Sequence, residues 1–165
     1  MRIGILTISD KGARGEREDR SGPAIREIME TAGAEIVRYR IVPDEQEAIR
    51  AALVEWSDEG VALILTTGGT GFSPRDWTPE ATRAVIERET PGISEAIRAA
   101  GLKKTPAAML SRAAAGIRKA TLIINLPGSE KGVRESLEAV VAVLPHAIEI
   151  IKGTAGECGR APRKP

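Results

Sequence analysis

The 165-residue sequence has few aromatic side chains and a single cysteine, and each shortage argues against a class of protein. Phe, Trp and Tyr together make up 2% of the residues, and the formal net charge is only +1. A nucleic-acid surface built from a basic stripe with stacking rings is therefore disfavoured. The lone Cys158 can build neither an internal disulfide nor a cysteine-based zinc site.

Long apolar runs are also lacking, so we expect no membrane span. The length suits one domain with its own core, and we expect this domain over residues 1–152 and a flexible tail over residues 153–165. The first residues run directly into a strand-like segment without the features of a secretory signal, which favours the cytoplasm.

Short apolar runs alternate along the chain with segments of helical period, as in a sheet of parallel strands. We expect strands at 2–9, 35–42, 61–67 and 121–126. Helices are expected at 21–33, 44–60, 78–88, 93–101 and from 130 onward, with a division at Pro145. The predicted fold is α/β: a single doubly wound, mostly parallel sheet with helices on both faces.

Polar residues follow each predicted strand, and the carboxyl ends of parallel strands meet at one edge of the sheet. The third strand is the most apolar and should be central. We therefore expect the polar segments to converge on one ligand site beside it. These segments are Ser9 and Asp10, then Asp44, residues 66–76 and residues 127–129.

The segment TTGGTG at residues 66–71 is the strongest candidate for an anion site. Its three glycines let backbone N–H groups approach an anion, and its threonines add hydroxyl donors. Three glycines would equally suit a tight turn that needs positive φ, but their place after the central strand favours a phosphate-bearing ligand. The candidate binding residues here are Thr67, Gly68, Gly69, Thr70 and Gly71.

Two further segments each have a functional and a structural interpretation. Residues 126–129 form a strand-to-helix turn in which Ser129 can cap the helix, and the same helix N-terminus could bind a second anion. Arg14, Arg17 and Arg20 could fold over a polyphosphate, although such a charged loop is more often only solvated.

Two aspartates, Asp44 and Asp76, follow strands at the predicted edge of the sheet. Spacing alone favours Asp44 as a helix N-cap. Asp76 has no such explanation, because Thr78 is already a candidate cap for the next helix. Two carboxylates beside a phosphate would repel it unless a divalent cation bridged them, and Mg²⁺ takes one or two carboxylates together with substrate phosphates. Asp44 and Asp76 together thus suggest a Mg²⁺-nucleotide site.

Five segments together resemble the MogA/MoaB family of molybdopterin adenylyltransferases, which is similar to the G domain of gephyrin. The resemblance covers residues 2–152. Its segments are TISD at 7–10, VPDE at 42–45, TTGGTGFSPRDWTPEAT at 66–82, SRAAAGI at 111–117 and NLPGS at 125–129.

This resemblance implies that the chain transfers AMP from ATP to the terminal phosphate of molybdopterin and releases pyrophosphate, with Mg²⁺ as cofactor. It implies that Asp44 and Asp76 are the catalytic and metal-binding aspartates. It further implies a homotrimer, and a separate molybdate-inserting enzyme that consumes the product. The substrate- and phosphate-binding residues would be Ser9, Asp10, the glycine-rich loop, Ser111, Pro127, Gly128 and Ser129.

Two alternatives stand beside the adenylyltransferase. A non-catalytic molybdopterin carrier or scaffold would keep the fold and the glycine-rich loop. An unrelated Mg²⁺-dependent nucleotide-binding domain would bind ATP without preference for the pterin. Some relatives in the MoaB branch lack the first aspartate and are inactive, whereas this chain has both Asp44 and Asp76, which favours an enzyme.

Overall fold

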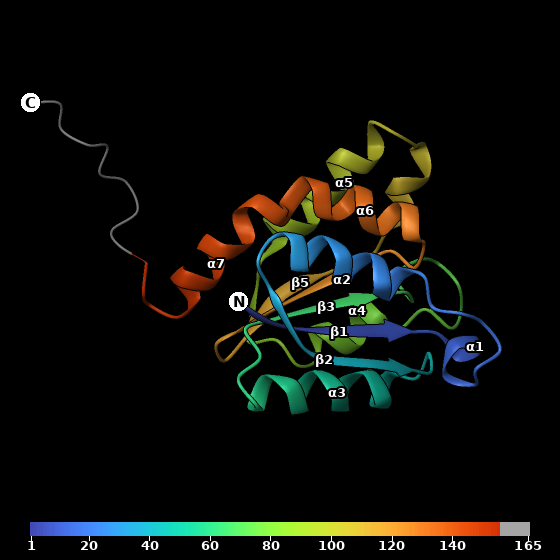
Figure 1. Cartoon of the computed structure of the whole chain (residues 1–165). Helices are drawn as coiled ribbons and strands as arrows, with labels where there is room; N and C mark the ends of the chain where they lie inside the picture. The colour runs from blue at the N-terminus through green and yellow to red at the C-terminus, as the bar shows by residue number, and fades with distance from the viewer. Residues whose placement is uncertain (156–165) are drawn as a thin grey trace, which may run out of the picture.

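The computed structural model describes residues 1–155 and contains one six-stranded sheet with the strand order β2-β1-β3-β6-β5-β4 (Figure 1). The pairs β1/β2, β1/β3 and β3/β6 are parallel, whereas β4/β5 and β5/β6 are antiparallel. The strands are β1 (Arg2–Ile8), β2 (Glu35–Val42), β3 (Leu63–Thr67), β4 (Arg88–Glu89), β5 (Ala115–Arg118) and β6 (Thr121–Leu126).

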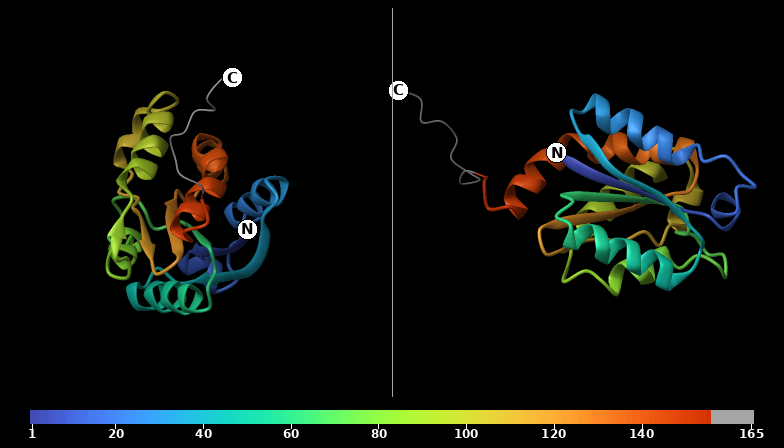
Figure 2. Two further views of the ribbon diagram at one scale, coloured as in Figure 1. Left: turned by 90° about the vertical axis from the view of Figure 1, so that its left-hand side faces the viewer. Right: turned by 60° about the horizontal axis from the view of Figure 1, so that its bottom comes forward.

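Helices cover both faces of the sheet, which confirms the predicted fold class (Figures 1 and 2). One layer contains α2 (Ser21–Thr31), α5 (Pro91–Leu102), α6 (Glu130–Val140) and α7 (Leu144–Ile151). The opposite layer contains α3 (Gln46–Asp58) and α4 (Thr78–Arg83). The remaining elements are the short helix α1 (Asp10–Ala13) and the 3-10 helices η1 (Pro106–Leu110) and η2 (Val141–Val143).

Burial on both faces explains why β3 is apolar along its whole length. Leu63 and Leu65 point into the cluster beneath α2, α5 and α6, while Ile64 points into the cluster beneath α3 and α4. Trp56 of α3 is fully buried in this second cluster. A central parallel strand must satisfy two cores at once, so it lacks the polar alternation of a half-exposed strand.

The antiparallel edge of the sheet was not predicted. Strand β4 has only two residues, and β5 begins with alanine and glycine, so neither carries a clear strand pattern. A Cβ on Gly116 would lie 2.7 Å from the carbonyl oxygen of Arg88, so glycine permits this close pairing. The helix predicted over 78–88 ends at Arg83 instead, since the chain must turn into β4.

Other expectations for the second half of the chain are confirmed. The side chain of Ser129 accepts a hydrogen bond from the N–H of Gly132 and caps α6. The division at Pro145 is also confirmed, because α7 begins at Leu144 with the proline in its first turn. None of the described helices is long and apolar enough to cross a membrane. Most of the predicted tail, with Cys158, lies outside the described residues.

Candidate functional site

A cavity of about 790 Å³ opens at the carboxyl ends of β1 and β3, where the strand order reverses. This switch point is where open α/β sheets bind their ligands. We call it the switch-point cavity. The structure brings to it seven of the residues proposed from the sequence: Ser9, Asp44, Thr67, Gly68, Gly69, Gly128 and Ser129. Arg17 and Arg20 also line it, whereas the side chain of Arg14 binds Glu16.

The glycines of the β3 loop are required by both backbone conformation and close packing. Gly68 and Gly69 have φ values of 99° and 63°, which disfavour other residues. A Cβ on Gly68 would lie only 2.3 Å from the carbonyl oxygen of Ile8, and one on Gly128 would lie 3.2 Å from the Cα atom of Gly68. The loops after β1, β3 and β6 therefore contact one another through backbone, and they form one wall of the switch-point cavity.

A second cavity of about 440 Å³ lies beside α5, η1 and α6, and we call it the η1 cavity. The structure places Thr70, Gly71, Ser111 and Pro127 in its lining. Ser129 lines both cavities. All of the predicted site residues except Asp10 and Asp76 therefore divide between these two neighbouring cavities.

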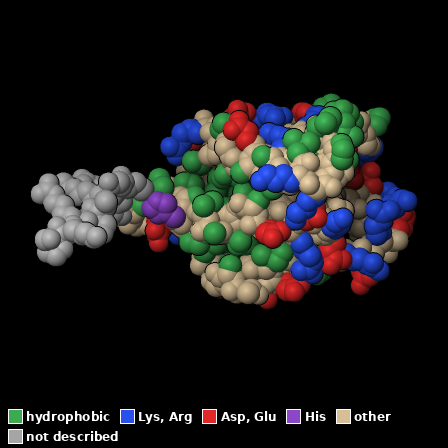
Figure 3. Space-filling view, turned by 90° about the horizontal axis from the view of Figure 1, so that it is seen from above, with side chains coloured by type: hydrophobic (Ala, Val, Ile, Leu, Met, Phe, Trp, Pro, Cys, Tyr) green, Lys and Arg blue, Asp and Glu red, His purple; other side chains and the backbone are tan. Residues whose placement is uncertain are grey.

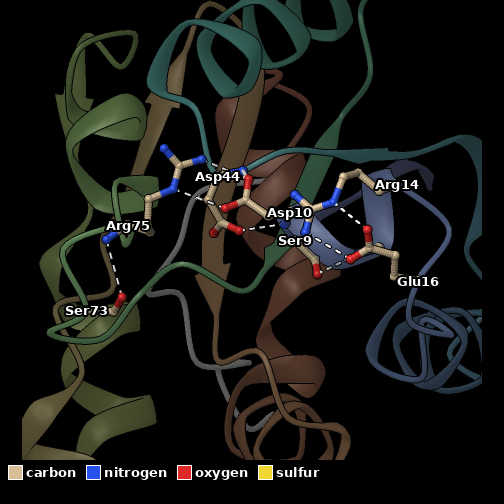
Figure 4. Close-up of polar contacts among 8 residues, drawn as sticks. Ser9, Asp10, Arg14, Glu16, Asp44, Ser73 and Arg75 are labelled. Atoms are coloured by element: carbon tan, nitrogen blue, oxygen red, sulfur yellow. Dashed lines mark hydrogen bonds and ion pairs between the residues drawn. The ribbon is translucent and has the colours of Figure 1, made fainter.

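Asp10 and Asp44 bind each other's backbone at the mouth of the site (Figure 4). The N–H of Asp10 donates to Oδ2 of Asp44 at 2.7 Å, and the N–H of Asp44 donates to Oδ1 of Asp10 at 3.0 Å. The prediction that Asp44 caps the following helix is wrong. Helix α3 starts after Glu45 without a side-chain cap among the described residues, because the Asp44 carboxylate is turned toward the β1 loop.

Arg75 supplies the positive charge at this point, and sequence reasoning assigned it no role. Its Nε and Nη2 atoms donate to the two carboxylate oxygens of Asp10 at 3.0 and 2.8 Å (Figure 4). The hydrogen bond from Arg75 is the largest influence on Asp10 and, with that from the Asp44 backbone, lowers the pKa of this carboxyl. Burial, together with the charges of Asp10 and Asp76, raises the pKa of Asp44. Asp44 is therefore a partly desolvated carboxylate that lies near two others.

Asp76 belongs to the loop between β3 and α4 and closes a turn of this loop. Its Oδ2 atom accepts a hydrogen bond from the N–H of Ser73 at 3.0 Å. Among the described residues that line the two cavities, neither Asp10 nor Asp76 occurs. The predicted capping role of Thr78 is wrong, since its hydroxyl instead donates to the carbonyl oxygen of Gly68 at 2.8 Å and holds the outgoing end of the loop.

Asp19 is a further cavity residue that sequence reasoning missed, and its carboxylate binds the first turn of α2. Its Oδ1 atom accepts from the N–H of Gly22 and the hydroxyl of Ser21, both at 3.0 Å. Its Oδ2 atom accepts from the hydroxyls of Thr7 and Tyr39. The carboxylate thus joins β1, β2 and α2 at the wall of the switch-point cavity. An aspartate two residues before the serine was the available signal.

The Asp19 contacts predict a pH dependence of stability. Partial burial alone would raise the pKa of Asp19, but the four hydrogen bonds outweigh it and lower the pKa. Burial, followed by the bond to Asp19, raises the pKa of Tyr39 to about 12. Stability from Asp19 is therefore complete above its unfolded-state pKa and is lost as the pH falls through the lower folded-state value.

We expect the Asp19→Asn variant to lose part of the acid dependence of unfolding that the wild type shows between about pH 5 and pH 2. Urea unfolding at a series of pH values measures it. Tyr39→Phe is the matched variant, because it removes one hydroxyl bond and should lose a smaller part. An unchanged pH dependence in Asp19→Asn would contradict this account of the carboxylate.

The chain is similar to known proteins in family, sequence and structure. Residues 4–146 match the family model described as "Probable molybdopterin binding domain". The molybdenum cofactor synthesis protein cinnamon of Drosophila melanogaster is 49% identical over 151 residues, which cover 90% of this chain and 25% of cinnamon. The chain thus spans about a quarter of that relative.

Relatives of similar length also match. The molybdopterin adenylyltransferase of Helicobacter pylori strain J99 is 44% identical over 156 residues, which cover 93% of this chain and 89% of that protein. The crystal structure of the molybdopterin biosynthesis enzyme MoaB from Thermus thermophilus superposes with a TM-score of 0.88 at 57% identity. The superposition covers 92% of this chain and 96% of the MoaB chain.

Proposed function

Because the chain belongs to this family of molybdopterin-binding domains, we propose that it is a molybdopterin adenylyltransferase of molybdenum cofactor biosynthesis. The observation that carries the proposal is the 44% identity, over nearly the full length of both chains, to a protein of that name. The switch-point cavity and the neighbouring η1 cavity support it, since the reaction needs two ligands joined at a phosphate.

In the proposed reaction, an oxygen of the terminal phosphate of molybdopterin attacks the α-phosphorus of ATP. The bond between that phosphorus and the bridging oxygen breaks, AMP is joined to the pterin phosphate, and pyrophosphate leaves with the electron pair. No nucleophile from the protein is required. Catalysis then depends on alignment of the two phosphates and on neutralisation of charge.

The residues of the site divide these tasks. The N–H of Gly68 already donates to the carbonyl oxygen of Leu126, so the backbone N–H of Gly69 and the first turn of α6 after Ser129 are the groups that suit phosphate oxygens. Arg17 and Arg20 in the lining of the switch-point cavity add positive charge. Ser129 borders both cavities and stands where the two ligands would meet. Ser111, Thr70 and Gly71 would contact the part of the substrates in the η1 cavity.

The carboxylates fit a Mg²⁺ ion that arrives with the nucleotide. Residues 1–155 contain no group of three or more His, Cys, Asp or Glu side chains that could hold a metal by themselves. Mg²⁺ bound to phosphates needs only one or two carboxylates, and the crowding of negative charge at Asp44 favours a cation there. Asp44 and Asp76 would hold the ion, which would neutralise charge on the phosphates.

We further propose that the enzyme works in the cytoplasm as a homotrimer. The use of ATP supports a cytoplasmic location, and the product would pass to a molybdate-inserting enzyme. Apolar side chains are exposed on α5, η1 and α7, at Leu102, Met109, Leu110 and Ile150, and groups of apolar side chains are visible from above the molecule (Figure 3). They support association between copies of the chain, for which we propose a homotrimer.

The enzyme and carrier alternatives are distinguished by pyrophosphate release from ATP, Mg²⁺ and molybdopterin. We expect release that depends on the pterin and that falls about 10²-fold in Asp44→Ala. A reaction without pterin is the blank, and retained folding of the variant is checked by thermal unfolding. Pterin binding without pyrophosphate release would support the non-catalytic carrier instead.

A further inference from the structure

The loop that carries Asp76 runs from Gly68 to Trp77 without regular secondary structure, and a residue far away in sequence spans it. Arg112 lies between η1 and β5. Its Nε atom donates to the carbonyl oxygen of Gly71 at 2.7 Å, and its Nη2 atom donates to the carbonyl oxygen of Asp76 at 2.6 Å. Its backbone N–H donates to the carbonyl oxygen of Thr70 at 2.9 Å. One residue thereby fixes both ends of the segment 70–76.

The guanidinium is also held from its other side. Its Nη1 atom forms an ion pair with the carboxylate of Glu80 in the first turn of α4. All three nitrogens of the side chain therefore have protein partners. A half-buried arginine with this set of contacts holds the loop in place. If the side chain moved away, two loop carbonyl oxygens and a carboxylate would lose their hydrogen-bond donors.

We propose that Arg112 is a positioning residue for Asp76, an inference that rests on the proposed adenylyltransferase function. By binding the Asp76 carbonyl oxygen, Arg112 sets the backbone from which the Asp76 side chain projects. The planar fork of arginine reaches several acceptors at fixed angles, whereas a lysine ammonium cannot reproduce this geometry. Arg112 acts through Asp76 and does not itself touch the phosphates.

The first test is independent of activity. Amide hydrogen exchange in residues 70–78 should become about tenfold faster in Arg112→Lys. Arg118→Met is the matched control, because Arg118 is also partly buried, donates to the carbonyl oxygen of Val85 at 3.2 Å and pairs with Asp58. It lies at the opposite end of β5. Unchanged exchange in the Arg112 variant would overturn the proposal.

The second test asks whether Arg112 acts through Asp76. In the wild-type background, Arg112→Lys should lower kcat for pyrophosphate release about 10²-fold, because small misplacements of reacting groups have effects of this size. In an Asp76→Asn background the same change should alter kcat by less than about twofold. Multiplicative losses in the double variant would show that Arg112 acts elsewhere, which would also overturn the proposal.

The two tests separate this inference from the function on which it rests. If the wild type released no pyrophosphate, the proposed function would fail, and the exchange measurement would still decide whether Arg112 braces the loop. Arg112→Lys keeps the positive charge opposite Glu80, so it is preferred to a neutral replacement that could unfold the chain. Equal thermal stability of the Arg112→Lys and Arg118→Met variants would exclude a general loss of structure as the cause.

Discussion

Asp76→Asn should lower pterin-dependent pyrophosphate release by about 10³-fold while leaving the fold intact. The proposed role of Asp76 depends on its negative charge, which would help to hold Mg²⁺ against the phosphates. Its structural role needs only an acceptor for the N–H of Ser73, at 3.0 Å from Oδ2. The amide oxygen of asparagine can fill that role, so charge and structure are separated by this one change.

Steady-state kinetics and urea unfolding of the same preparation measure the two effects. Asp58→Asn is a suitable control, because Asp58 pairs with Lys119 at 2.8 Å at the end of α3 and lines neither of the two cavities. It should leave turnover unchanged. If Asp76→Asn turned over at the wild-type rate with its fold preserved, Asp76 would have no part in metal binding or in the transfer.

Gly68→Ala should destabilise the chain by about 3 kcal/mol and disrupt the contact between the β1 and β3 loops. Two causes combine at this position. The φ value of 99° is unfavourable for alanine, and the new methyl group would lie 2.3 Å from the carbonyl oxygen of Ile8. A backbone oxygen of a central strand cannot move aside, so β1 and the glycine-rich loop would have to separate.

The matched control is Gly60→Ala. Gly60 has a similar φ value of 75°, but no atom lies within 4 Å of a Cβ there. Backbone strain alone should give about 1 kcal/mol. Urea unfolding measures the difference between the two variants. Equal free energies of unfolding would show that the contact between the β1 and β3 loops contributes nothing, and the account of the cavity wall would be wrong.

The order of strands and helices was predictable because buried parallel strands have a strong sequence signal. The segments EIVRYRIV and TLIINL match β2 and β6 residue for residue. The strands β4 and β5 gave no such signal, because they are short and their pairing depends on the missing side chain of Gly116 rather than on an apolar pattern. The fold class did not depend on them.

The location of the site could be predicted from the sequence, but the hydrogen-bond partners of its side chains could not. Topology alone indicated that the segments around Ser9, Asp44 and Gly68 would converge. The partners of individual side chains depend on contacts between distant loops, and local rules misassigned them. Asp44 and Thr78 both follow the sequence preference of helix caps, yet each binds a loop instead. Arg75 and Arg112 carry no local signal of their contacts with Asp10 and Asp76.

The most direct test of the proposed function follows the label of α-³²P-ATP during incubation of the wild-type protein with Mg²⁺ and molybdopterin. We predict that the label moves to the pterin in a one-to-one ratio with released pyrophosphate, because the α-phosphorus becomes bound to the terminal phosphate of the pterin. A pterin that is bound by the protein but remains unlabelled, while the label stays in ATP, would contradict the adenylyltransferase.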